Sequence, residues 1–240
     1  MTTETTRTLH ELKLPGMAKS WEALNETHQL DRLSLRDGFE LMLQAERDNR
    51  HESRIRRLLH NAHMRQQAAI EHLETDTARS LSSAQVSELA TGEYIDHGMT
   101  VLITGAAGTG KSYFACALGD RACRQGKKTI YFTMNMLVEN LRLSRLEGRQ
   151  TSFFRKISSH DLLIIDDFRM KKLDGELQTD FEQIIDDRYG SKALILASQL
   201  PVSEWYHLFQ SELIAEACLD RLVHKSLRFE LKGDSLRKKY

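Results

Sequence analysis

The segment at 105–112 constrains the fold of this chain more than any other. It reads Gly-Ala-Ala-Gly-Thr-Gly-Lys-Ser, which matches the pattern G-x-x-x-x-G-K-[ST] in full, and it lies between the apolar run 101–104 and an apolar helical stretch. Glycines let such a loop wrap a phosphate with inward-pointing N–H groups, and the following helix N-terminus adds a favourable dipole. A chance glycine-rich turn would lack the flanking strand and helix. The pattern therefore predicts a phosphate-binding loop.

The loop assigns a role to each of its residues. Lys111 would reach the β- and γ-phosphates of a nucleotide, and the Ser112 hydroxyl would bind Mg²⁺. The remaining residues would surround the phosphates with backbone N–H groups: Gly105, Ala106, Ala107, Gly108, Thr109 and Gly110. We therefore expect a nucleoside triphosphate and Mg²⁺ as ligands.

An acidic strand end is the expected partner of this loop. Residues 161–167 read Asp-Leu-Leu-Ile-Ile-Asp-Asp, and a buried strand of this kind delivers its last acids to the carboxyl edge of a parallel sheet. Asp166 would hold Mg²⁺ directly or through water, and Asp167 would orient or deprotonate an attacking water. The alternative is an ordinary strand that ends in a solvated acidic turn. With the phosphate loop present, hydrolysis is favoured over binding alone.

The region 99–240 alternates short apolar runs with amphipathic helical stretches, which is typical of an α/β fold with an open parallel sheet. The five expected strands are 100–104, 129–133, 162–166, 193–198 and 226–231. The expected helices are 111–125, 135–147, 176–189 and 211–223.

Residues 1–98 differ from the rest of the chain in net charge and in secondary-structure pattern. They carry 12 basic and 16 acidic side chains, a net charge of −4, whereas 99–240 carries 22 and 18, a net charge of +4. Only helical signals are present: Pro15 suits the first turn of a helix, Ser34 suits an N-cap, and apolar residues recur at helical spacing over 55–62. We therefore predict a small helical domain over 1–75, a linker over 76–98 and a nucleotide-binding domain over 99–240.

The composition excludes several classes of protein. With 34 basic and 34 acidic side chains, the overall charge does not draw the chain to nucleic acid or to an anionic membrane. No apolar run approaches the roughly 18 residues of a membrane helix, and the first ten residues lack a signal-peptide core. Cys116, Cys123 and Cys218 show no metal spacing and are expected to be reduced. These features predict a cytoplasmic protein.

Four segments together carry a resemblance to a known family. They are the phosphate loop, LLIIDDF at 162–168, ILASQLPVSEW at 195–205 and ACLDRLVHKSLRFELKGDSLRKK at 217–239. These segments resemble the IstB family of AAA+ ATPases, which accompany insertion-sequence transposases and are related to DnaC-type helicase loaders. The N-terminal LHELKLPGMAKSWEAL at 9–24 is also similar to that family, so the resemblance covers nearly the whole chain.

The resemblance implies a P-loop AAA+ core with a five-stranded parallel sheet, preceded by a small helical partner-binding domain and without a C-terminal helical lid. It implies an ATPase that uses ATP and Mg²⁺, forms a ring or spiral homo-oligomer on duplex DNA, and helps a cognate transposase select and use target DNA. The closest alternative is a DnaC-like loader of a replicative helicase. A third alternative is a DNA-binding scaffold in which ATP serves only to hold the assembly together.

The resemblance also suggests roles for three more residues. Gln199 would sense the γ-phosphate, the alternative being a polar residue that leaves a strand. Arg221 would act as an arginine finger on a neighbouring subunit's nucleotide, the alternative being a helix-end arginine with a nearby acidic partner. Arg237, in the terminal Gly-x-Ser-x-Arg, would act as a second sensor. Asp167 is one methylene shorter than the usual glutamate, although an Asp pair is similar to what this family shows, and Arg169 stands where the family commonly has glycine.

Three clusters are basic despite the neutral total: 47–65, 142–156 and 221–240. Arginines placed on phosphates release counterions and make DNA affinity depend on salt. In IstB and DnaC relatives the helical region after the second strand faces a central channel, so the resemblance points to Arg142, Arg145 and Arg149 as DNA contacts. Their spacing places them on one helix face, and the alternative is a solvated face. For 47–65, a partner-binding or solvated surface is favoured over DNA.

Two further pairs of residues, one of histidines and one of phenylalanines, are expected to have no part in binding. His60 and His63, in an arginine-rich helix without nearby cysteine, are expected at the surface rather than on a metal. Phe153 and Phe154 are expected to pack a short helix against the sheet rather than to stack on bases.

Overall fold

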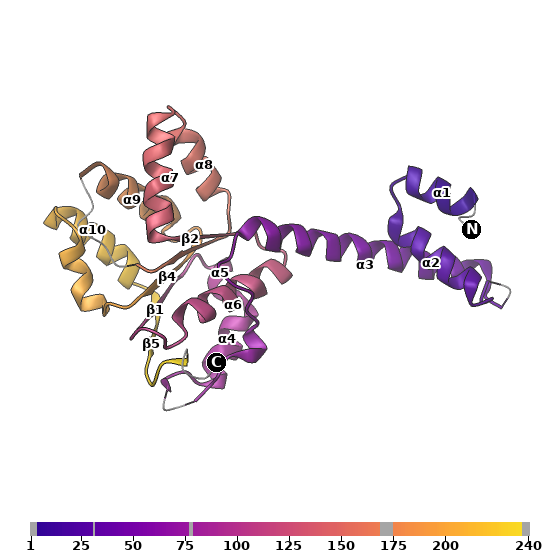
Figure 1. Cartoon of the computed structure of the whole chain (residues 1–240), viewed down its shortest axis with the longest axis horizontal. Coiled ribbons are helices and arrows are strands. Elements are labelled where there is room, and N and C mark those ends of the chain that lie inside the picture. The colour runs from indigo at the N-terminus through magenta and orange to yellow at the C-terminus, as the bar shows by residue number, and fades with distance from the viewer. Residues whose placement is uncertain (1–3, 31, 77–78, 169–174, 237–240) are drawn as a thin grey trace. The chain divides into compact units, whose positions relative to one another are not determined.

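The computed structural model describes residues 4–30, 32–76, 79–168 and 175–236 (Figure 1). The contacts within the chain divide it into two units, Met1–Arg57 and Leu58–Tyr240. The predicted boundary near residue 75 and the predicted linker over 76–98 do not match this division. Leu81, Leu89 and Tyr94 are buried in one core cluster with side chains of the sheet, so apolar packing makes this segment part of the second unit.

The first unit is helical. α1 spans Glu4–Glu11, α2 spans Pro15–Glu26 and α3 spans Leu35–Ala62, so the division between the units falls within α3. Pro15 occupies the first turn of α2, and Ser34 Oγ accepts a hydrogen bond from the Asp37 backbone N–H at 3.1 Å, as the sequence predicts. The helical signals after Ser34 and over 55–62 belong to one helix of 28 residues.

Glu46 holds α2 against α3. Its carboxylate accepts hydrogen bonds from the backbone N–H groups of Gly16 at 2.7 Å and Met17 at 3.3 Å, where the start of a helix leaves donors unpaired. Burial opposes ionisation of Glu46, but an ion pair with Arg50 at 2.7 Å and these N–H donors together lower its pKa. Gly16 is required here, because a Cβ would lie 2.5 Å from the Ala45 carbonyl oxygen.

Five strands form one parallel sheet in the second unit. Across the sheet they are β2 (Thr129–Thr133), β3 (Leu162–Asp166), β4 (Ala193–Ser198), β1 (Thr100–Gly105) and β5 (Ser226–Leu231). The predicted fold class and strand positions are thus confirmed. Because parallel strands place their carboxyl ends at one edge, Gly105, Asp166 and Ser198 end on the same side of the sheet.

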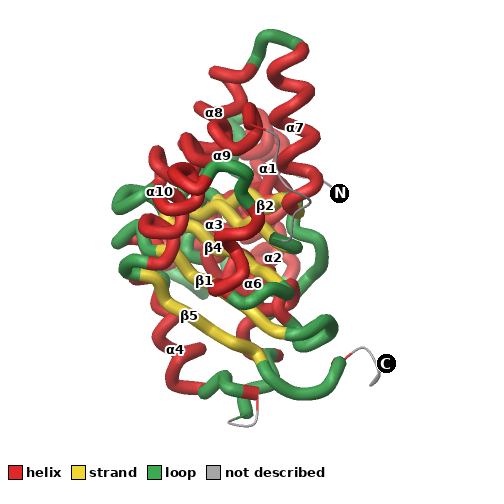
Figure 2. The backbone as a smooth tube through the Cα atoms, turned by 90° about the vertical axis from the view of Figure 1, so that its left-hand side faces the viewer, coloured by secondary structure: helices red, strands yellow, loops and turns green. Residues whose placement is uncertain are grey.

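Helices cover both faces of this sheet (Figures 1 and 2). One face packs against α4 (Ser83–Thr91), α5 (Glu93–Asp96) and α6 (Lys111–Arg124). The other face packs against α7 (Met134–Leu146), α8 (Gln150–Ser158), α9 (Gly175–Arg188), the 3₁₀ helix η3 (Val202–Leu208) and α10 (Glu212–Val223). Coverage on both sides explains why the central strands are apolar at nearly every position.

The aromatic pair of α8 packs into this second layer. Phe154 is buried, and the ring of Phe153 meets that of Phe132 edge-on with centroids 6.1 Å apart. The packing interpretation of the pair is therefore confirmed.

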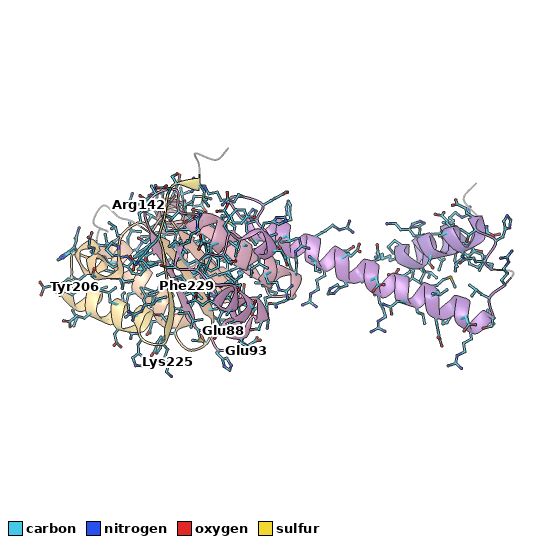
Figure 3. The ribbon with its side chains drawn as sticks, turned by 90° about the horizontal axis from the view of Figure 1, so that it is seen from below. Glu88, Glu93, Arg142, Tyr206, Lys225 and Phe229 are labelled. Carbon is cyan, nitrogen blue, oxygen red and sulfur yellow. The ribbon has the colours of Figure 1, made fainter. Side chains whose placement is uncertain are left out.

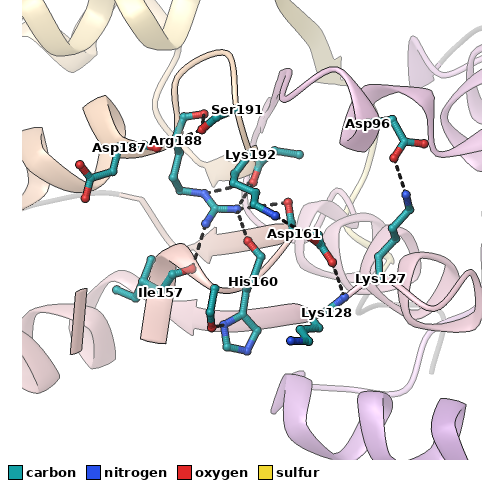
Figure 4. A network of polar contacts seen from close by, with 12 residues as sticks. Asp96, Lys127, Lys128, Ile157, His160, Asp161, Asp187, Arg188, Ser191 and Lys192 are labelled. Atoms are coloured by element: carbon teal, nitrogen blue, oxygen red, sulfur yellow. Dashed lines mark hydrogen bonds and ion pairs between the residues drawn. The ribbon is translucent and has the colours of Figure 1, made fainter. Parts of the chain in front are cut away.

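A buried arginine ties together the amino ends of β3 and β4, at the edge opposite to the phosphate loop (Figure 4). The guanidinium of Arg188 donates, at 2.6–3.3 Å, to the backbone carbonyl oxygens of Ile157, His160, Asp161 and Ala193. Burial lowers the pKa of Arg188 to about 10, which leaves the side chain charged at neutral pH. Carbonyl dipoles therefore take the place of water around this charge.

Three smaller observations complete the fold. Cys116, Cys123 and Cys218 are buried free thiols. Residues 232–236, the described part of the chain after β5, contain no α-helix. No helix in the described ranges is both long and apolar enough to cross a membrane.

Candidate functional site: a nucleotide-binding cavity

The phosphate loop connects β1 to α6. The strand ends at the first residue of the motif and the helix begins at Lys111, which is the context that the motif requires. Gly108 and Gly110 have φ angles of 84° and 95°, a region that favours glycine, so the loop depends on their missing side chains. Lys111 Nζ donates a hydrogen bond to the Ala106 carbonyl oxygen at 2.7 Å, so the ammonium group lies against the loop that would hold the phosphates.

Two segments outside the motif support this loop. Arg79, which precedes β1, donates from Nη2 to the Thr109 carbonyl oxygen at 2.8 Å. After β5, the Leu236 backbone N–H donates to the Gly108 carbonyl oxygen at 3.0 Å. Ser235 lies so close to Gly108 that a Cβ there would collide with the serine side chain. The terminal Gly-x-Ser motif therefore contacts the phosphate loop directly.

Neighbouring groups hold the first of the two carboxylates at the end of β3. Tyr131 on β2 donates from Oη to Asp166 Oδ2 at 2.8 Å, and the Asp167 backbone N–H donates to Asp166 Oδ1 at 2.7 Å. Burial and the negative charge of Asp166 raise the pKa of Tyr131 above its ordinary range, so the phenol remains a donor. Asp166 is 1% exposed and Asp167 36%. The first carboxylate is thus fixed from two sides, and the second reaches solvent.

A cation that the sequence does not predict faces this acidic pair. Arg65 Nη1 lies 3.0 Å from Asp167 Oδ2 and 3.8 Å from Asp166 Oδ2. The residue belongs to a stretch that the sequence assigns to the N-terminal helical domain. The cluster of arginines around it signals only surface charge, so no local pattern identifies Arg65 as part of the site.

A cavity of about 910 Å³ brings the phosphate loop and Asp167 together. Lys111, Ser112, Asp167 and Gln199 line it, and its volume suits a small-molecule ligand. Residues between 65 and 81, His72, Leu73 and Arg79 among them, also line it. Sequence reasoning missed these residues because it placed them in a separate domain and a linker.

The residues assigned by resemblance lie in different places. Gln199 follows β4 and lines the cavity. Arg221, on α10, pairs through Nε with Asp186 of α9 at 2.8 Å and is absent from the described residues that line the cavity. Arg237 and Arg169 lie outside the described residues.

The prediction that Arg142, Arg145 and Arg149 share one helix face is wrong. α7 ends before Arg149, because Gly148 adopts a φ of 67°, so Arg149 cannot share a helix face with Arg142 and Arg145. Arg145 also pairs with the buried carboxylate of Asp180 at 2.8 Å. Arg142 is exposed on α7 (Figure 3).

The donors at the acidic edge suit a hard divalent cation. Mg²⁺ takes oxygen ligands, usually one or two carboxylates with the phosphates of a substrate, and Ser112, Asp166 and Asp167 offer such oxygens. Among the described residues, no group of three or more His, Cys, Asp or Glu could hold a metal by itself. His60 and His63, whose rings are 6.2 Å apart, belong to no such group. The residues therefore fit Mg²⁺ that arrives with a nucleotide.

The strand order β5-β1-β4-β3-β2, with the phosphate loop after β1 and the acids after β3, defines the AAA+ P-loop fold, which confirms the predicted fold class. The chain belongs to the family of IstB-like ATP binding proteins, whose family model matches residues 7–240. The resemblance seen in the sequence is thus confirmed over almost the whole chain.

Similar proteins come from bacterial insertion sequences. One, named an insertion sequence ATP-binding protein of Sinorhizobium fredii, is 36% identical over 230 residues, which cover 96% of this chain and 94% of that protein. Another, named as the ATP-binding protein of insertion sequence IS1162 from Pseudomonas fluorescens, is 36% identical over 204 residues, which cover 85% and 88% of the two chains.

Solved structures show the same fold at low identity. The replication initiator DnaA bound to AMPPCP and single-stranded DNA gives a TM-score of 0.59 at 20% identity, covering 72% of this chain and 52% of that one. The DnaC helicase loader gives 0.55 at 18% identity, covering 69% and 97%. These two likenesses support the AAA+ fold alone.

Proposed function

We propose that this protein assembles with ATP on duplex DNA and helps a cognate transposase to select and use target DNA. Membership of a family whose similar proteins are named for insertion sequences supports the link to transposition. The structural observation that carries the proposal is the separation of Arg221 from its own chain's cavity. A site that needs an arginine from a neighbour becomes fully active only in an assembly.

The cavity residues divide the proposed reaction between them. The loop N–H groups and Lys111 bind the phosphates, and Ser112 with Asp166 would hold Mg²⁺. When bound, Mg²⁺ neutralises charge on the phosphate oxygens. Asp167 orients the attacking water and accepts its proton, and Gln199 contacts the γ-phosphate. The oxygen of this water bonds to the γ-phosphorus while the bond from that phosphorus to the β–γ bridging oxygen breaks, giving ADP and inorganic phosphate.

Arg221 is the residue that we propose acts on another subunit. It lies in the last turn of α10, its side chain is 30% exposed, and its guanidinium is held by Asp186 and by the Ala217 carbonyl oxygen at 3.0 Å. We propose that in the assembly this guanidinium leaves Asp186 and contacts the γ-phosphate of the neighbour's nucleotide. The contact stabilises the charge that develops during phosphoryl transfer.

DNA binding is proposed to depend on assembly. The chain as a whole is neutral, so one copy attracts DNA weakly. Arg142 is an exposed cation of α7, and an oligomer repeats it once in every subunit. Each added arginine–phosphate contact increases affinity and its dependence on salt. The N-terminal helices remain the proposed partner-binding region.

Mixing two inactive variants tests the finger in trans. We expect Arg221→Ala and Asp167→Asn to lower steady-state ATP turnover on DNA at least about 100-fold when each is alone, since removing a finger typically costs far more. A random equal mixture should recover about a quarter of the wild-type rate, because one interface in four combines an intact acid with an intact arginine. Phosphate release measures this.

The matched control is Arg155→Ala, an exposed arginine of α8, which should retain near wild-type turnover. Absence of recovery at every mixing ratio, with both variants folded and able to join assemblies, would contradict a finger that acts between subunits.

Binding experiments test the partners. With a non-hydrolysable ATP analogue and Mg²⁺, we expect the protein to sediment as an oligomer on duplex DNA and to retain its cognate transposase. Without nucleotide, duplex binding should weaken at least about tenfold, because the basic faces are no longer repeated. Retention of a replicative helicase in place of the transposase would support the loader alternative.

A further inference from the structure

Arg65 occupies an unusual position for a residue outside every recognised motif. Its guanidinium lies within ion-pair distance of both carboxylates at the end of β3, at 3.0 and 3.8 Å. It also lines the nucleotide cavity together with Lys111, Ser112 and Asp167. A positive charge therefore lies in the cavity beside Asp167.

The backbone around Arg65 is anchored to the nucleotide-binding core. Met64 packs so closely on Gly119 of α6 that a Cβ at Gly119 would lie 2.9 Å from the methionine Sδ. Four residues after Arg65, the Ala69 backbone N–H donates to Tyr113 Oη at 3.4 Å. Because Gly119 and Tyr113 both belong to α6, the helix that begins at Lys111 also positions Arg65.

The burial of Asp166 distinguishes this arrangement from an ion pair between two exposed side chains. Asp166 is almost completely buried, and Tyr131 satisfies one of its oxygens as a neutral donor. A neutral hydrogen bond does not remove the negative charge of two adjacent carboxylates, whereas a guanidinium offsets much of it. The side chain of Arg65 is itself 49% exposed, so it has room to move away.

We propose that Arg65 is an internal counter-ion of Asp166 and Asp167, which Mg²⁺ bound to the nucleotide must displace. This inference rests on the proposed function, in which these acids hold the metal ion and the attacking water. Arg65 is a positioning residue. Without metal it holds the two carboxylates together, and it is released when Mg²⁺ and the nucleotide bind. Because Mg²⁺ must displace Arg65, the apparent affinity of the site for Mg²⁺ is lower than it would be for the two carboxylates without Arg65.

The test measures nucleotide binding against Mg²⁺ concentration, with a fluorescent non-hydrolysable ATP analogue and the full chain. We expect Arg65→Gln to lower the half-saturating Mg²⁺ concentration about tenfold, equivalent to a coupling of about 1.4 kcal/mol. Binding of the same analogue in EDTA should stay within about twofold of wild type, because Arg65 acts on the acids and not on the phosphates. The half-saturating Mg²⁺ concentration of Arg65→Lys should lie between those of the wild type and of Arg65→Gln.

Two control variants separate the outcomes. Arg155→Gln removes the same charge from an exposed site on α8 and should leave the Mg²⁺ dependence unchanged. Asp166→Asn should raise the half-saturating Mg²⁺ concentration, because it removes a carboxylate that would bind the metal. If it does not, the assignment of the magnesium site itself fails. If Asp166→Asn behaves as expected but Arg65→Gln requires equal or more Mg²⁺, only the counter-ion role is overturned. Loss of binding in EDTA by Arg65→Gln would identify a phosphate ligand and also overturn it.

A measurement on wild-type protein covers the case in which Arg65→Gln is poorly folded. The Arg65 guanidinium Nη–H resonance, assigned with the Arg65→Lys variant, should be protected from exchange without ligand, because Nη1 donates to Asp167 Oδ2. On addition of Mg²⁺ and the ATP analogue it should lose that protection, whereas the analogue in EDTA should leave it in place. Protection that persists with Mg²⁺ present would contradict displacement.

Discussion

Replacing Lys111 with alanine is expected to reduce ATP turnover at least about 100-fold, the loss seen when one well-placed electrostatic contact is removed from a transition state. The ammonium group lies on the phosphate loop at 2.7 Å from the Ala106 carbonyl oxygen, so it is positioned before the nucleotide arrives. Phosphate release and binding of a fluorescent ATP analogue should both fall, because Lys111 contacts phosphates in the bound state and during transfer.

Lys128→Ala is the matched control for this change. Lys128 is an exposed lysine directly before β2, at the amino edge of the sheet. It should keep wild-type binding and turnover, and both variants should unfold at nearly the wild-type temperature. A folded Lys111→Ala variant with undiminished turnover would contradict the assignment of the phosphate loop.

Arg188→Met is expected to lower the free energy of unfolding of the second unit by about 4 kcal/mol. A buried carbonyl group that loses its donor costs about 1–3 kcal/mol before relaxation, although the Ile157 and Asp161 oxygens each keep a backbone N–H donor at 3.1 Å. Four carbonyl oxygens share this one guanidinium. An apolar side chain can replace a buried ion pair when both partners are removed, but here the carbonyl groups remain. Arg188→Lys should lose about half as much, because one ammonium cannot reach all four oxygens.

Urea unfolding followed by Trp205 fluorescence measures this loss. Trp205 is fully buried in the second unit, and a Trp21→Phe background removes the tryptophan of the first unit. Arg155→Met, an exposed substitution on α8, should change the free energy of unfolding by less than about 0.5 kcal/mol. A loss below about 1 kcal/mol for Arg188→Met would show that water replaces the guanidinium.

The fold was predictable where a local pattern determines local structure. The apolar run at 162–165 must be buried on both sides, so it indicates a parallel strand, and Asp166 and Asp167 then have to emerge at its carboxyl end. The phosphate loop is predictable for a similar reason, since glycines at fixed spacing specify a backbone path. The structure contains both the strand and the loop at the predicted positions.

Other parts depend on contacts between residues far apart in the chain. Nothing in the sequence near Arg65 or Arg79 indicates that these side chains meet the acids and the phosphate loop, because the partners lie 102 and 30 residues away. The segment 76–98 looked like a linker because it is short and polar. Its few apolar residues, such as Leu89 and Tyr94, are nevertheless enough to fix it on the core.

The backbone of Asp167 explains which carboxylate this position accepts. Its φ of +52° lies in the left-handed region, which costs most L-residues about 1–2 kcal/mol and which aspartate and asparagine tolerate best. A glutamate would carry the same charge with a backbone less suited to this turn. Asparagine keeps the turn while removing the charge, whereas alanine would change both. The short acid that departs from the usual AAA+ pattern thus follows from chain geometry, and related sequences with this turn should prefer Asp over Glu there.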